Sequence, residues 1–100
     1  DEDMLNAVRF HTTGRKGMSL LEKIIFLADA IEPNRSYPGV NDLRAMSEQN
    51  LDKACLMSLQ RTIEYVRSQG QDLDPRTLEA AEDLIEKTGG ASRRERKEIP

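Results

Sequence analysis

The sequence predicts an all-α fold of about five helices, and three observations support that prediction. Apolar residues recur at helical spacing along the chain, and no stretch alternates long enough to form a strand. Helix-capping and helix-breaking residues interrupt the pattern at Ser19, Pro33, Asn50 and Asp74. The length, 100 residues, is that of one small domain or of part of one.

The first expected helix covers about residues 3–10. Its apolar face holds Met4, Ala7 and Val8. A Thr-Thr-Gly turn follows at residues 12–14, so the only histidine of the chain, His11, is expected at the end of this helix.

The second expected helix carries the clearest signals. Ser19-Leu20-Leu21-Glu22 is a capping box, in which the serine oxygen accepts from an unpaired backbone N–H and Glu22 reaches back. The helix ends at about Ile31, because the residue before Pro33 avoids the helical region. Apolar residues cover so much of its surface that we expect it to be central to a core. One face should hold Leu20, Ile24, Leu27 and Ile31, widened by Leu21, Ile25 and Ala28, with Phe26 on another side.

Two helices are expected after the polar loop at residues 34–39. A short one, over about residues 41–48, should bury Leu43 and Met46. A long one begins at the cap Asn50 and runs to about residue 69, before Gly70. Its inward residues should be Leu51, Ala54, Cys55, Leu59, Thr62, Ile63 and Val66.

The last expected helix begins with Asp74 as its N-cap and Pro75 in its first turn. Gly89-Gly90 ends it, and Leu78, Ala81, Leu84 and Ile85 supply its apolar stripe. Residues 91–100 form a polar tail that we expect to be disordered, although its basic cluster could touch an acidic partner.

Composition excludes several classes of protein. The net charge of −3 argues against a general nucleic-acid binder, and no apolar run approaches the roughly 18 residues that span a bilayer. The acidic N-terminus is unlike a signal peptide. The single Cys55 cannot form an internal disulfide, so we expect the protein to belong to a reducing cytoplasm. We expect Cys55 itself to be a small residue of the core.

Two residues form a candidate metal pair. An imidazole and a carboxylate, such as those of His11 and Asp29, are good ligands for iron, manganese or zinc. Asp29 lies among apolar neighbours, where an ionised carboxylate needs a partner. The alternative is structural, with His11 interacting with a helix dipole and Asp29 facing water.

Two polar segments are candidate phosphate sites. Thr12, Thr13, Gly14, Arg15 and Lys16 combine hydroxyls, a glycine turn and two cations, which can grip phosphate oxygens. The segment Glu32-Pro33-Asn34-Arg35 follows Asp29 directly, and its Asn34 and Arg35 could bind phosphate or ribose. An ordinary loop and a solvated helix-ending turn are the respective alternatives.

Taken together, these segments resemble a known family. LNAVRFHTTGRKGMSLLEKIIFLADAIEPNR, residues 5–35, resembles the second half of the YqeK family of HD-superfamily phosphohydrolases, most specifically in HTTGR, MSLLEKIIFLAD and IEPNR. The resemblance continues through YPGVNDLR, LDKACLMSLQRTIEYV and DPRTLEAAEDL, and covers roughly residues 4–84.

The resemblance implies a fold, a reaction and roles for residues. It implies an all-α, HD-domain-like helical bundle with a dinuclear metal centre of iron, which hydrolyses diadenosine tetraphosphate symmetrically to two ADP. It makes His11 a late histidine ligand and Asp29 the closing aspartate of the H…HD…D signature. The expected contacts of the dinucleoside polyphosphate, or of ADP, are Arg15, Asn34 and Arg35, with Thr13 and Glu32 as weaker candidates.

The chain departs from the family in lacking the H…HD half of the signature. With one histidine it cannot supply a complete dinuclear site. We therefore expect residues 1–90 to be the C-terminal part of an HD-type domain without the family's N-terminal helices, and the isolated chain to be inactive or nearly so. A naturally shortened relative is the alternative.

A partial domain would expose core surface, so we expect self-association as a homodimer or a helix-swapped assembly. A non-catalytic module that binds nucleotides or another protein, and a purely structural helical domain, remain open as other functions.

Overall fold

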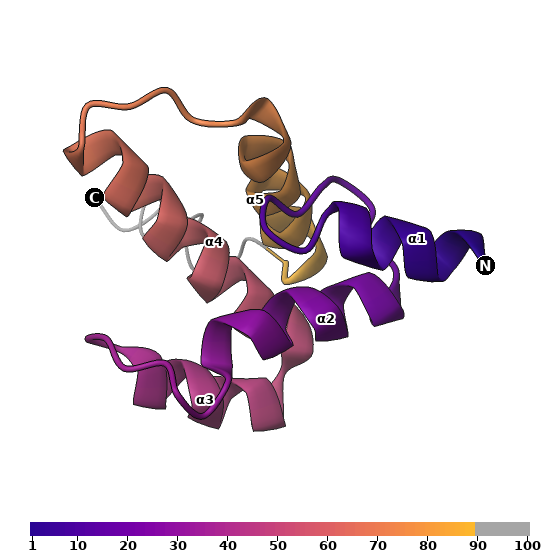
Figure 1. Cartoon of the computed structure of the whole chain (residues 1–100), viewed down its shortest axis with the longest axis horizontal. Helices are drawn as coiled ribbons and strands as arrows, with labels where there is room; N and C mark the ends of the chain where they lie inside the picture. Colours follow the sequence, from indigo (N-terminus) through magenta and orange to yellow (C-terminus); the bar gives the residue numbers. More distant parts are fainter. Residues whose placement is uncertain (90–100) are drawn as a thin grey trace.

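The computed structural model describes residues 1–89, and these residues form five α-helices (Figure 1). No strand occurs within this described part of the chain, so the all-α prediction is confirmed. The predicted tail, residues 91–100, lies outside it. The helices are α1 (Glu2–Arg9), α2 (Leu20–Ile31), α3 (Val40–Gln49), α4 (Leu51–Ser68) and α5 (Pro75–Lys87).

The helix starts lie where the capping residues predict them. The Ser19 hydroxyl accepts from the backbone N–H of Glu22 at 3.2 Å, and the Asn50 side chain accepts from that of Lys53 at 3.0 Å. Asp74 caps α5 with Pro75 in the first turn. Each side chain thereby satisfies a backbone donor that the helix itself leaves without a partner.

The long helix α4 organises the packing. It contacts α2, α3 and α5, while α1 lies alongside α2 (Figure 1). The core between these helices is built from Met18, Phe26, Leu27, Leu43, Ala54, Cys55, Leu59, Ala80, Ala81 and Leu84. Cys55 is fully buried, as expected of a small core residue.

The predicted face of α2 is correct only in part. Leu27 is buried and Ile31 packs against the core, but Leu20 and Ile24 are exposed. The helix buries Phe26 and the carboxylate of Glu22 instead. Apolar residues occur on nearly every side of this helix, so periodicity alone does not select the face that α4 covers. Thr62 of α4 was predicted to point inward, but it is exposed.

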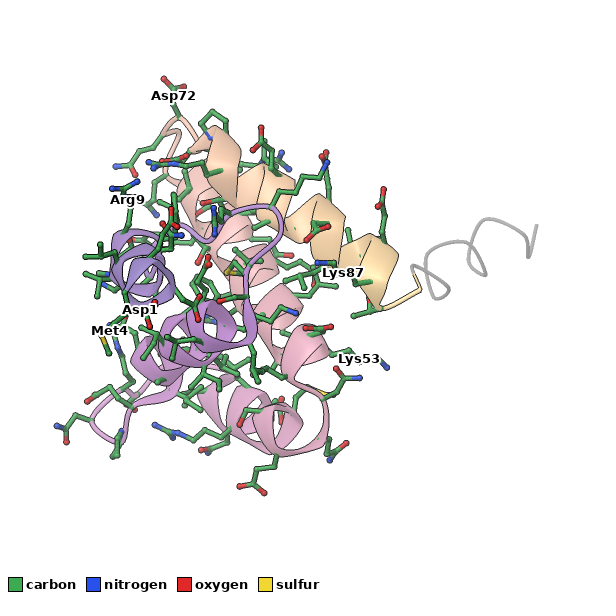
Figure 2. All side chains as sticks on the ribbon, turned by 90° about the vertical axis from the view of Figure 1, so that its right-hand side faces the viewer. Asp1, Met4, Arg9, Lys53, Asp72 and Lys87 are labelled. Atoms are coloured by element: carbon green, nitrogen blue, oxygen red, sulfur yellow. The ribbon has the colours of Figure 1, made fainter. Side chains whose placement is uncertain are left out.

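Six large apolar side chains of α1 and α2 are exposed, and we call them the α1–α2 apolar face. Figure 2 shows α1 end-on at the left of the molecule, with Met4 pointing outward. The members are Met4, Leu5, Val8, Leu20, Ile24 and Ile25, with exposed fractions between 38% and 66%. Exposed apolar surface of this extent is typical of interaction sites.

Within residues 1–89, no helix has both the length and the apolar character needed to cross a membrane.

Candidate functional site

A cleft of about 630 Å³ opens between α4 and the segments around the C-terminal end of α2. Its volume lies in the range of small-molecule sites, about 300–1,000 Å³. One side is lined by His11 and Thr12 after α1, by Phe26, Asp29 and Ala30 of α2, and by Arg35 and Tyr37 of the next loop. The other side is a stripe of α4 that contains Ser58, Arg61, Thr62, Glu64, Tyr65 and Ser68.

His11 enters the cleft with its ring orientation fixed. Its Nδ1 lies 2.6 Å from the backbone carbonyl of Val8, and because a carbonyl only accepts, Nδ1–H is the donor. In the neutral imidazole this leaves the lone pair on Nε2. Histidines that bind metals commonly donate their other N–H to a carbonyl in this way. The half-buried His11 therefore has one nitrogen anchored and one available.

Asp29 lies in the last turn of α2, exposed toward the cleft. Its carboxylate pairs with the Arg35 guanidinium at 3.2 Å, and Arg35 Nε also donates to the Asp29 backbone carbonyl at 3.0 Å. Asp29 was expected among apolar groups, where a metal could be its partner, but its side chain is 48% exposed and its partner here is Arg35. Three predicted site residues, His11, Asp29 and Arg35, come together in the cleft.

The loop that carries Arg35 is held by Arg44 of α3. Arg44 donates to the backbone carbonyls of Ile31, Glu32 and Arg35 at 3.0–3.2 Å. The hydroxyl of Tyr37 donates to the carbonyl of Ala30 at 2.6 Å. Pro33 has no N–H and ends the helix, so side chains take the place of backbone donors at the end of α2.

Arg15 makes an ion pair that the sequence did not predict. Its guanidinium donates to both carboxylate oxygens of Glu22, at 2.8 and 2.7 Å, and lies 4.8 Å from the centroid of the Phe10 ring. Hydrogen bonding from Arg15 holds the pKa of the buried Glu22 carboxyl below its usual range, although burial opposes this. A hydrogen bond from the Ser19 backbone also lowers this pKa, as the capping box implies. Arg15 is not part of the cleft lining.

The other predicted substrate contacts, Thr13, Glu32 and Asn34, do not line the cleft either. The backbone carbonyl of Thr13 accepts from the Thr77 hydroxyl at 2.9 Å, which ties the HTTGR segment to α5. Glu32 caps the end of α2, and Asn34 is exposed in the following loop.

Gly14 shows why the HTTGR segment fits so tightly. It is buried with φ +70°, and a Cβ there would meet the side chains of Ala80 and Leu59 at 3.3 Å. Only glycine combines this backbone conformation with so close an approach.

The sequence interpretation missed the α4 side of the cleft. Ser58, Arg61 and Tyr65 share a helix face, and a polar stripe at that spacing was the available signal. The loop residue Tyr37 was missed because only tertiary packing brings it to α4, where the Arg61 guanidinium lies 4.0 Å from its ring centroid.

Comparisons with known proteins identify relatives that share this sequence and fold. No family model matches the chain. The chain is 52% identical, over 85 residues, to the symmetrical bis(5'-nucleosyl)-tetraphosphatase of Halalkalibacterium halodurans. It is 47% identical, over 78 residues, to the protein of the same name from Bacillus subtilis. These alignments cover 85% and 78% of this chain and 46% and 42% of the two relatives.

A solved structure matches the fold as well. It is described as a predicted HD superfamily hydrolase involved in NAD metabolism from Clostridium acetobutylicum, with a TM-score of 0.85 and 53% sequence identity. The match covers 87% of this chain and 46% of that chain. The chain spans less than half the length of the relatives it matches. With this identity carried through a shared fold, the chain is similar over most of its length to symmetrical bis(5'-nucleosyl)-tetraphosphatases and to an HD superfamily hydrolase.

Proposed function

We propose that this chain supplies part of the active site of a metal-dependent phosphohydrolase that cleaves diadenosine tetraphosphate symmetrically into two ADP. The observation that carries the proposal is the convergence of His11 and Asp29, from different elements, on one cleft. The printed names of the relatives, symmetrical bis(5'-nucleosyl)-tetraphosphatase, supply the reaction class.

The two residues fit a metal by their chemistry. The imidazole Nε2 of His11 and the carboxylate of Asp29 are a donor set suited to iron, and the Val8 carbonyl orients the ring. Within residues 1–89, no group of three or more histidine, cysteine, aspartate or glutamate residues could hold a metal. The remaining ligands would therefore come from another part of a longer polypeptide or from another chain. A bound metal would supply Lewis-acid stabilisation and an activated water.

The residues of this chain have separate tasks in this proposal. Arg35 offers guanidinium N–H donors to phosphate oxygens inside the cleft, and Arg44 holds its loop in place. Arg15 also holds the HTTGR segment in place through Glu22. Thr13, Arg15, Glu32 and Asn34 remain candidate contacts, since each belongs to a segment that reaches the cleft.

The α1–α2 apolar face supports the assignment of residues 1–90 to part of an HD-type domain. We infer that the remaining part of the domain covers this face, and that the isolated chain covers it by self-association as a homodimer or a helix-swapped assembly. The free and buried Cys55 suits a protein of the cytoplasm.

A chimera tests the proposed activity. The matched 85 residues of the Halalkalibacterium halodurans relative are replaced by those of this chain, and ADP released from diadenosine tetraphosphate with ferrous iron is measured by chromatography. We expect two ADP per substrate, and Asp29→Ala or His11→Ala should lower turnover by more than about a hundredfold.

Asp42→Ala is the matched control, because Asp42 is an exposed aspartate of α3 outside the cleft lining. An active chimera that keeps its turnover after Asp29→Ala would contradict the proposal. A folded chimera that binds ADP without hydrolysis would favour the non-catalytic nucleotide-binding module.

A further inference from the structure

The loop that follows α1 carries His11 and runs along α5 (Figure 1). It contacts residues of α5 that are three positions apart and therefore lie on one side of that helix. The contacts occur in the same order along both segments, and they join Thr13 to Thr77, Gly14 to Ala80, and Gly17 to Asp83. The loop is thus held against α5 along its length, although it has no regular structure of its own.

Thr77 makes the contact nearest to His11. The residue is 3% exposed, and its hydroxyl donates to the backbone carbonyl of Thr13 at 2.9 Å. Thr88, at the other end of α5, donates instead to the carbonyl of Leu84 within the same helix. The Thr77 hydroxyl therefore bonds the loop rather than its own helix, and its removal would leave a carbonyl of the loop without this donor.

The loop end that Thr77 holds belongs to a closed turn around His11. The backbone N–H of Gly14 donates to the carbonyl of Phe10 at 2.8 Å, so residues 10–14 form one turn. His11 lies inside this turn, and its Nδ1–H donates to the carbonyl of Val8. The orientation of the His11 ring thus depends on both ends of the turn, of which α1 holds one and α5 holds the other.

Asp83 holds the loop further along. Its side chain is 11% exposed, and its carboxylate accepts from the backbone N–H of Gly17 at 3.0 Å and pairs with Lys87 at 3.1 Å. Among the helices of residues 1–89, α5 packs against α4 alone. The loop contacts therefore link α5 to His11, since neither Thr77 nor Asp83 lines the cleft.

We propose that α5 positions the metal ligand His11, with Thr77 as the main positioning residue and Asp83 as its support, and this inference rests on the proposed function. Neither residue touches metal or substrate. By holding the Thr13 carbonyl, Thr77 keeps the turn in the conformation in which the Val8 carbonyl accepts from Nδ1–H and the lone pair stays on Nε2. Residues that orient a ligand in this way typically change metal affinity by roughly 10- to 100-fold.

The tautomer of His11 tests this proposal directly, because His11 is the only histidine of the chain. We would label the full 100-residue chain with ¹⁵N-histidine and record two-bond ¹H–¹⁵N spectra at about pH 8.5, where an ordinary imidazole is neutral. The unchanged chain should show the Nδ1–H form. Thr77→Val, which keeps the shape and removes the hydroxyl, should convert it into a mixture of the two tautomers.

Thr77→Ser keeps the hydroxyl and should keep the Nδ1–H form. Thr88→Val is the matched control, because it removes a hydroxyl that bonds only within α5. Thr77→Ala is the second variant if Thr77→Val does not fold, since alanine has the higher helix propensity. The Nε2–H form in the unchanged chain, or an undiminished Nδ1–H form in a folded Thr77→Val or Thr77→Ala chain, would overturn the proposal.

The Halalkalibacterium halodurans chimera separates this proposal from the proposed function. Titration with ferrous iron should show about tenfold weaker affinity after Thr77→Val and full recovery in Thr77→Ser. Affinity that falls after His11→Ala but not after Thr77→Val would refute the positioning role alone. Affinity that is independent of His11, together with the expected tautomers, would refute the proposed function and leave the hold of α5 on the turn intact.

Discussion

At the scale of single residues, Glu22 is the most unusual group in the molecule. Its carboxylate is 2% exposed, and Arg15 contacts both of its oxygens from the HTTGR segment. An ionised carboxylate without a partner in such a place is strongly unfavourable. Arg15 therefore couples the folding of α2 to the position of the turn that follows His11.

Arg15→Leu should lower the free energy of unfolding by roughly 2 kcal/mol, less than for a fully buried pair because the Arg15 side chain is 33% exposed. The reason is that Glu22 stays buried without its partner. Urea denaturation measures the change, and Arg15→Leu combined with Glu22→Leu should recover much of the loss. A single variant as stable as the unchanged chain would show that the pair does not hold the segment.

The same pair predicts a dependence on pH. Because the pKa of Glu22 is lowered in the folded protein, its contribution is complete above the ordinary value of 4.5 and is lost as the pH falls through the folded pKa. Urea denaturation at several acidic pH values should show a steeper loss of stability in the unchanged chain than in Glu22→Gln. Parallel curves would contradict the assignment.

Cys55 should be chemically inert in the folded protein. Burial, with the nearby charge of Asp52 adding to it, raises the pKa of its thiol to about 12. A thiol reagent such as DTNB should therefore react only through unfolding, so the rate should rise with urea in step with the unfolded fraction. Fast reaction without urea would contradict the burial of this thiol.

At the scale of elements, the end of α2 depends on Arg44. This side chain contacts three backbone carbonyls and so fixes the loop from which Arg35 reaches the cleft. Lysine cannot replace it, because a single ammonium group lacks the planar arrangement of donors that spans these carbonyls.

Arg44→Lys should accelerate amide hydrogen exchange at Arg35 and Val40 by about tenfold, the equivalent of about 1.4 kcal/mol. These amides close the loop by donating to the carbonyls of Glu32 and Tyr37. NMR-detected exchange measures the effect, and Arg67→Lys on the exposed side of α4 is the control. Unchanged exchange in Arg44→Lys would show that the backbone alone holds the loop.

The sequence predicts element boundaries better than it predicts element faces. Ser19, Asn50 and Asp74 mark helix starts correctly, because capping is a contact within one turn. The buried side of α2 and the α4 wall of the cleft depend on which helices pack together. Periodicity does not encode that choice for α2, because this helix is apolar on most sides. The sequence also did not predict that Arg15 pairs with Glu22, seven residues along the chain, because that contact depends on how the HTTGR turn folds back onto α2.

At the scale of the whole molecule, the α1–α2 apolar face is the surface through which we expect the isolated chain to associate. Light scattering after size exclusion should show the 100-residue chain as a dimer or larger. Leu20→Glu, which adds a charge at an exposed position of this face, should shift it toward monomer. Gln60→Glu adds the same charge on α4 and should leave the assembly unchanged. A clean monomer for the unchanged chain would contradict this prediction.

The proposed function requires His11 and Asp29 of this chain to hold metal in an HD-type phosphohydrolase. The most direct test is the metal content per chain of the Halalkalibacterium halodurans chimera after gel filtration, measured by mass spectrometry of the elements. We expect Asp29→Asn and His11→Ala to lower the metal content and Asp42→Asn to leave it unchanged. Equal metal content in the unchanged chimera and all three variants would contradict the proposed roles of His11 and Asp29.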